Sequence, residues 1–181
     1  MKKSMILTAI LCITFLFVSY PMTSMGEESK AVKAEEVVKA QVEHSEGHYL
    51  EEMLRSHPSQ PIMDVEDLAE GIQTLCDCAH TCVICADACV GEKDPMLTRC
   101  ARINQDCANI CMTTAKILSR QTEAPKNIII SQLKTCALAC RECGQECKKH
   151  AEKYGHCRIC ADVCLNCEKV CQELIEELEE D

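Results

Sequence analysis

The sequence contains no tryptophan and only two phenylalanines and three tyrosines among 181 residues. Aromatic side chains can therefore contribute little to a hydrophobic core. Glycine and proline are also scarce, with six and five residues. Small disulfide-stapled exported proteins are usually rich in loops, so this scarcity disfavours that class. A basic excess is missing as well, because the formal net charge is −10, and this argues against nucleic acid as a partner.

Cysteine is abundant instead, with 18 residues. From Cys157 to Cys171 the cysteines are spaced by three, four, three and four residues, which keeps them on one face of an α-helix. No glycine or proline interrupts this segment. The same spacing recurs in two further segments and, more thinly, in a third; their cysteines are Cys78, Cys82, Cys85 and Cys89; Cys136, Cys140, Cys143 and Cys147; and Cys100, Cys107 and Cys111. The pattern predicts four helices with thiols on their inward faces.

Residues that commonly begin and end helices divide the second part of the chain. Asp64 is suited to an N-cap, and Gly91 fits a C-terminal stop. The predicted helices cover residues 64–91, 95–121, 125–154 and 156 to the acidic C-terminal tail. Short connections force consecutive helices to run antiparallel. The predicted fold is all-α, an antiparallel up-down-up-down four-helix bundle with a cysteine-lined core.

The first 26 residues have the pattern of a signal peptide. Lys2 and Lys3 precede an apolar run from Met5 to Val18, which is short for a membrane span. Cleavage after Gly26 is expected, which would place the protein in the periplasm or outside the cell, without a membrane anchor. Loss of Cys12 would leave 17 cysteines, an odd number that cannot all pair within one chain.

Residues 27–61 are predicted to form a charged linker with a possible short helix around Tyr49–Arg55, and residues 62–181 the bundle domain. His44 and His48 are four residues apart and could hold a metal transiently, although a solvated linker is the simpler interpretation. Pro58 and Pro61 mark the boundary.

The predicted topology stacks the cysteines in layers that each take one residue from every helix. The layers are Cys78, Cys111, Cys136 and Cys171; Cys82, Cys107, Cys140 and Cys167; Cys85, Cys143 and Cys164 with Asn104; and Cys89, Cys100, Cys147 and Cys160. Cys76 and Cys157 are predicted to extend this column at its two ends.

The two ends of the predicted column differ in chemistry. Beyond the Cys78 layer lie apolar residues such as Leu68, Leu75 and Leu133, which form a plug of ordinary core. Beyond the Cys89 layer the residues are polar and include three soft or borderline metal ligands, Met96, His150 and His156. A metal cargo is expected to enter through this polar end. For Met96, ordinary packing against its loop is an equal alternative to a role as a ligand.

The thiols themselves favour Cu(I), in multiple ions. Soft thiolates select Cu(I), zinc or iron–sulfur clusters. A zinc site of four thiolates carries two negative charges, and several in one buried column would be costly. Cu(I) is satisfied by few thiolates and can share them, so the loaded column stays near neutral. Iron–sulfur ligation and thiol–disulfide catalysis fit less well, because the thiols lie on helices and are buried. A zinc-sequestering protein and a disulfide-stapled structural protein of the envelope remain as alternatives.

The chain resembles the four-helix-bundle copper storage proteins from about Asp64 to Glu177. The motifs that carry the resemblance are Cys78-Ala-His-Thr-Cys82, Cys85-Ala-Asp-Ala-Cys89, Cys107-Ala-Asn-Ile-Cys111, Cys136-Ala-Leu-Ala-Cys140 and Cys160-Ala-Asp-Val-Cys164. The resemblance implies a tetrameric or otherwise homo-oligomeric store of Cu(I). We expect a protein with no catalytic role that serves copper storage or detoxification and exchanges Cu(I) with a copper donor or acceptor. It also implies loading from an end that carries His or Met, to which Met96, His150 and His156 would correspond.

Overall fold

A computed structural model describes residues 48–180 of the chain. Within that range there are five α-helices, one short 3₁₀-helix and no β-strand. They are α2 (His48–Arg55), α3 (Val65–Gly91), η1 (Pro95–Leu97), α4 (Thr98–Leu118), α5 (Lys126–Lys148) and α6 (Gly155–Glu180). The predicted all-α class is confirmed.

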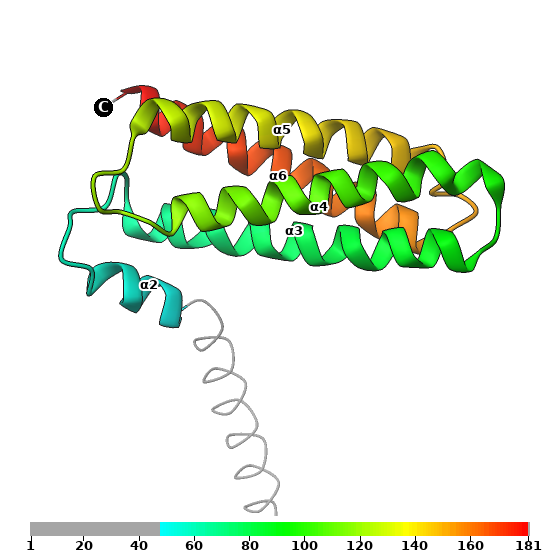
Figure 1. Cartoon of the computed structure of the whole chain (residues 1–181), viewed down its shortest axis with the longest axis horizontal. Coiled ribbons are helices and arrows are strands. Elements are labelled where there is room, and N and C mark those ends of the chain that lie inside the picture. Colours follow the sequence, from blue (N-terminus) through cyan, green and yellow to red (C-terminus); the bar gives the residue numbers. More distant parts are fainter. Residues whose placement is uncertain (1–47, 181) are drawn as a thin grey trace, which may run out of the picture. The chain divides into compact units, whose positions relative to one another are not determined.

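The four long helices α3 to α6 lie side by side (Figure 1). Helix α3 packs against α4 and α6, and α5 packs against the same two helices. The four helices therefore enclose one common core. Helix α3 is long and apolar enough to cross a membrane by composition alone, but its cysteines Cys78, Cys82, Cys85 and Cys89 are buried in this core.

Helix α3 begins where the sequence predicted. The carboxylate of Asp64 accepts hydrogen bonds from the backbone N–H groups of Glu66 at 2.8 Å and Asp67 at 3.4 Å, as an N-cap does. The helix ends at Gly91. Lys93, two residues later, has a positive φ of 55°, which reverses the chain toward η1 and α4.

Two predicted helix ends are wrong. The second helix stops at Leu118 rather than near residue 121, and the third stops at Lys148 rather than Tyr154. Cys147 is the last residue of α5 in the core, and the chain buries nothing more until Tyr154. Without an apolar face to pack, residues 149–154 form tight turns, in which the Tyr154 N–H donates to the His150 carbonyl at 2.9 Å.

The bundle's apolar end is filled as predicted. Leu68, Leu75 and Leu133 are fully buried there. Other buried members of this plug are Ile72, Leu118, Ile129, Leu174 and Leu178. The plug gives the bundle a conventional hydrophobic core next to the thiols.

Helix α2 falls within the segment predicted as a linker with a possible short helix. Its Leu54 is buried, and Arg55 forms an ion pair with Glu66 of α3 at 3.2 Å. Residues 1–47, which include the predicted signal peptide and His44, lie outside the described residues, so the predicted domain boundaries stay predictions.

Candidate metal centre

The core of the bundle is built from thiols. Seventeen free cysteines lie in the described part of the chain, and sixteen of them are buried. They take the place of leucine because spacing by three and four residues turns one face of each helix inward. Only Cys76 is partly exposed, packed at the edge of the core on α3. Burial, followed by the charge of Asp77, raises the pKa of its thiol.

Sulfur atoms from different helices lie close together throughout this core. The Sγ atoms of Cys82 and Cys164 are 3.4 Å apart, as are those of Cys111 and Cys140. Those of Cys100 and Cys147 are 3.5 Å apart. Such distances are van der Waals or weak hydrogen-bond contacts, much longer than the roughly 2 Å of a disulfide bond.

The thiols group into overlapping sets of four whose Sγ atoms all lie within 4.8 Å of one another. Five of these sets are Cys78, Cys82, Cys107 and Cys164; Cys78, Cys107, Cys111 and Cys140; Cys82, Cys143, Cys160 and Cys164; Cys85, Cys89, Cys100 and Cys157; and Cys111, Cys136, Cys140 and Cys167. Four of the five share cysteines with another set, so most of the core is a continuous ligand field rather than a row of separate sites.

The predicted layers are correct for three helices. Cys111 lies 3.8 Å from Cys78 and 3.6 Å from Cys136, as its layer requires. Cys107 lies 3.9 Å from Cys140 in the next layer. The relative register of α3, α4 and α5 therefore follows from the cysteine spacing and the antiparallel arrangement.

Helix α6 is displaced by one to two layers from its predicted place. Cys78 was predicted level with Cys171, but it lies 3.8 Å from Cys164. Cys82 likewise contacts Cys164 rather than Cys167. The cause is the early end of α5, which lets the chain turn back sooner. Cys157 consequently lies within the column, 4.0 Å from Cys100, rather than beyond its end.

Asn104 of α4 is fully buried among the thiols, as predicted for a corner of the column. Its Oδ1 accepts hydrogen bonds from Cys160 at 2.9 Å and from Cys143 at 3.3 Å. Its Nδ2 donates to the Cys100 carbonyl at 2.8 Å and lies 3.4 Å from the sulfur of Cys147. The predicted neighbour Cys143 is correct, whereas Cys160 replaces the predicted Cys164 because α6 is displaced.

The surroundings of the thiols shift their pKa values in opposite directions. Burial, and next the neighbouring Cys89, raise the pKa of Cys157 to about 12. Hydrogen bonding to Cys136 and Cys167 together with burial raises the pKa of Cys171. By contrast, hydrogen bonds from Cys100 first and Cys143 next lower the pKa of Cys147 to about 4. A metal ion must therefore displace protons from thiols such as Cys157, which keep them in the metal-free protein.

His156 joins the polar end of the column. Its Nδ1 lies 3.4 Å from the sulfur of Cys157, 3.5 Å from that of Cys85 and 4.0 Å from that of Cys89. Its Nε2 is buried without a hydrogen bond and lies 3.8 Å from a carboxylate oxygen of Glu92. Of the three non-cysteine residues predicted as ligands, His156 is the one that contacts thiols.

The other two predicted ligands lie apart from the thiol contacts. The side chain of Met96 is exposed on η1. His150 turns its Nε2 toward the buried carboxylate of Glu146, at 3.6 Å, where Arg99 and Lys149 also bind. Glu146 was not singled out from the sequence, because its spacing from Cys143 and Cys147 does not distinguish it from a solvated residue.

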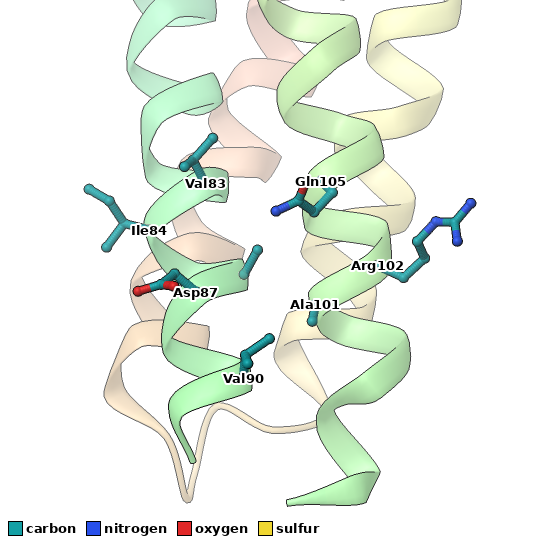
Figure 2. A pocket seen from close by; sticks show the side chains of 8 residues that line it. Val83, Ile84, Asp87, Val90, Ala101, Arg102 and Gln105 are labelled. Atoms are coloured by element: carbon teal, nitrogen blue, oxygen red, sulfur yellow. The ribbon is translucent and has the colours of Figure 1, made fainter. Parts of the chain in front are cut away.

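Two surface depressions border α3 and α4. The larger has a volume of about 610 Å³ and is lined by Val83, Ile84 and Val90 of α3 and by Arg102 and Gln105 of α4, among others (Figure 2). It has no thiol in its wall. The smaller, of about 380 Å³, lies at the polar end and includes Cys89 in its wall.

The sequence of residues 64–176 matches the copper storage protein family. A curated relative, the uncharacterized cysteine-rich protein YhjQ of Bacillus subtilis (strain 168), is 35% identical over 104 residues, which are 57% of this chain and 91% of the relative.

Solved structures of a copper storage protein from Streptomyces lividans, Ccsp, have the same arrangement. The form loaded with 10 copper equivalents is 40% identical, with a TM-score of 0.67, over 71% of this chain and 98% of its own. A form with five coppers is 43% identical, with a TM-score of 0.59, over 61% of this chain and 93% of its own.

The five-copper structure is that of a cytosolic copper storage protein. The predicted location in the periplasm or outside the cell is therefore wrong. The apolar run that suggested export lies outside the described residues. The match across the thiol-lined helices shows that this chain belongs to the copper storage protein family.

Proposed function

We propose that the protein stores multiple Cu(I) ions as cargo, bound by cysteine thiolates inside an antiparallel up-down-up-down four-helix bundle. The observation that carries the proposal is the overlap of the thiol sets. Cys111 and Cys140, for example, belong to two sets each. A cluster of ions that share bridging thiolates is what such overlap supports.

Charge balance favours Cu(I) over zinc. Each isolated zinc site with four thiolates would carry a charge of two minus in a core that water does not reach. The described core offers sixteen buried thiols and no lysine or arginine among its buried residues. One Cu(I) for about each thiolate leaves the loaded core near neutral, so its uptake requires no buried counter-charge.

The ligands proposed are the seventeen cysteines together with His156, whose Nδ1 is held among Cys85, Cys89 and Cys157. Met96 and His150 stay predictions as accessory ligands near the polar end. The protein is proposed to act as a store that exchanges copper with a donor or acceptor, to catalyse no reaction, and to work as a homo-oligomer.

An anaerobic titration with Cu(I) against a competing chelator tests this proposal. We expect tight, multi-ion uptake with a capacity that approaches the number of buried thiols, and no comparable uptake of zinc. Uptake of only a few ions, or stronger uptake of zinc than of Cu(I), would contradict it.

A thiol titration under denaturant distinguishes the store from a disulfide-stapled scaffold. The store predicts that all seventeen cysteines of the described residues react before loading, and that Cu(I) protects them afterwards. A scaffold would leave few reactive thiols at either stage.

A further inference from the structure

Two loops that are joined by a hydrogen bond and an ion pair cover the polar end of the thiol column. The Tyr154 hydroxyl donates to Oδ2 of Asp94 at 2.7 Å, and the Lys153 amine lies 3.1 Å from the same oxygen. Lys153 also lies over the Tyr154 ring, 4.7 Å from its centre. These contacts join the α3–η1 loop to the turn before α6.

Tyr154, which takes part in these contacts, packs against His156. Tyr154 is only 8% exposed, and its ring centre is 5.6 Å from that of His156. The Nε2 of His156 is buried as well. The side chain of His156 is 20% exposed and Cys157 is fully buried, so a copper carrier that approaches along the bundle axis meets His156 and Tyr154 before Cys157.

The smaller surface depression offers a path from the side. It lies between the end of α3, the following loop and the start of α4, and its volume is about 380 Å³. Its wall combines Cys89 with two charged residues, Lys93 and Asp94, and with less polar residues that include Leu97, Thr98 and Ala101. This volume is within the range of pockets that hold small molecules.

Cys89 connects the depression to the column. Its sulfur lies 3.9 Å from that of Cys157 and 4.0 Å from Nδ1 of His156. It also belongs to the set of four thiols with Cys85, Cys100 and Cys157. An ion bound to Cys89 is therefore already within reach of the next ligands.

Lys93 gives the depression a positive charge. It is exposed at the point where the chain reverses with a φ of 55°. Among residues 48–180, no carboxylate lies within ion-pair distance of its amine, and the adjacent Asp94 is engaged by Tyr154 and Lys153. An anionic group in the depression would thus meet an unpaired ammonium.

We propose that this depression, rather than the bundle axis, is the exchange port of the store, and that it receives Cu(I) from a small anionic thiol. The inference rests on the proposed function and adds the site and the carrier class. In the transfer, a bond forms between Cu(I) and the Cys89 sulfur while the bond to the carrier sulfur breaks. The proton of the Cys89 thiol passes to the carrier thiolate, which leaves as a thiol, and no atom changes oxidation state.

The test is anaerobic stopped-flow transfer of Cu(I) from its complex with glutathione, an anionic thiol, and from its complex with the neutral 2-mercaptoethanol. The parent should accept Cu(I) faster from glutathione at low salt. Lys93→Gln should reduce that preference about threefold, as loss of electrostatic steering does. Transfer rates for the two carriers that are equal in the parent would overturn the carrier class.

Two matched pairs of variants test the port itself. Thr98→Phe fills this depression and should slow transfer, whereas Gln105→Phe, two turns away on α4, fills the larger depression that has no thiol and should slow it less. Cys89→Ser and Cys171→Ser each remove one thiol, but Cys89→Ser should slow transfer severalfold more.

Equal rates within either pair would overturn the port. So would faster transfer after Tyr154→Phe, since Tyr154 belongs to the axial cover and does not itself line the depression. The equilibrium Cu(I) capacity of the parent is measured first, because it separates the two proposals. If the parent loads fully but the transfer rates are equal within both pairs, only the proposed exchange port is wrong. If the parent binds no Cu(I), both the proposed store and the proposed port are wrong.

Discussion

The thiol of Cys160 donates a hydrogen bond of 2.9 Å to the side-chain oxygen of Asn104 at the centre of the column. An amide therefore occupies a place that a thiol could take, and it satisfies its own hydrogen-bonding groups with Cys143 and with the Cys100 carbonyl. Because every polar atom of Asn104 has a partner, its burial does not carry the usual penalty of an unpaired polar group.

We expect Asn104→Cys to raise the Cu(I) capacity by about one ion, because a further sulfur would join Cys100, Cys143, Cys147 and Cys160. The helical content should stay the same. Chelator-competition titrations of the variant and the parent measure the difference, and circular dichroism checks the helicity. An unchanged capacity with intact helicity would count against the placement of Asn104 in the ligand field.

Asn104→Ala should instead weaken the metal-free protein without adding a ligand. The change removes the oxygen that accepts from the buried thiols of Cys160 and Cys143, and a buried group left unpaired costs about 1–3 kcal/mol. Urea unfolding of the metal-free protein measures the loss. An Asn104→Ala variant as stable as the parent would mean that the amide contributes no net hydrogen bonding.

Leu133→Ala should destabilise the metal-free bundle by about 2–5 kcal/mol, because Leu133 is fully buried in the apolar plug and the substitution leaves a cavity. Copper capacity should hardly change, since the thiols are untouched. Leu138→Ala is the matched control on α5, where the side chain is 49% exposed and the expected loss is within about 0.5 kcal/mol. Similar losses at the two positions would contradict the assignment of the plug.

Gly144→Ala should destabilise the bundle although alanine favours helices. An added Cβ would lie 3.0 Å from Cγ of Leu165 and 3.3 Å from the carbonyl oxygen of Ala161, which cannot move without shifting α6. We expect a cost of about 1–3 kcal/mol, which exceeds the propensity gain of about 1 kcal/mol. Gly91→Ala meets no atom within 4 Å and should not destabilise. Thermal unfolding of both variants measures the contrast, and equal stabilities would argue against the close α5–α6 packing.

The sequence was sufficient to predict most of the thiol core. Spacing by three and four fixes which face of each helix turns inward, and short connections fix direction, so the contact of Cys78 with Cys111 was predictable. The position of α6 along the column was not. It depends on where α5 ends, and nothing in the sequence around Lys148 distinguishes a turn from a continuing helix. Packing decides it, because residues 149–153 have no core to face.

The cover of the axial end was also missed for a physical reason. Asp94 and Tyr154 are 60 residues apart, at the boundaries of two different predicted helices, and spacing alone gives no reason for them to meet. Their hydrogen bond exists because the two loops meet at the same end of the bundle. A contact of this kind depends on the exact lengths of α3 and α5, which a pattern of spacing does not give.

Replacing Met96, His150 and His156 together by Leu or Gln is expected to slow Cu(I) uptake and release with little change in capacity. Most of the effect should come from His156→Gln alone, because the Nδ1 of His156 lies within 4.0 Å of three thiols, whereas Met96 is 75% exposed. The imidazole can take over an ion from Cys89 and pass it to Cys85 or Cys157. Stopped-flow transfer from a Cu(I) chelator to the triple variant, to His156→Gln and to the parent measures the three rates. If His156→Gln exchanged copper as fast as the parent while the triple variant was slow, the role in transfer would belong to Met96 or His150, and the placement of His156 among the thiols would have no kinetic consequence.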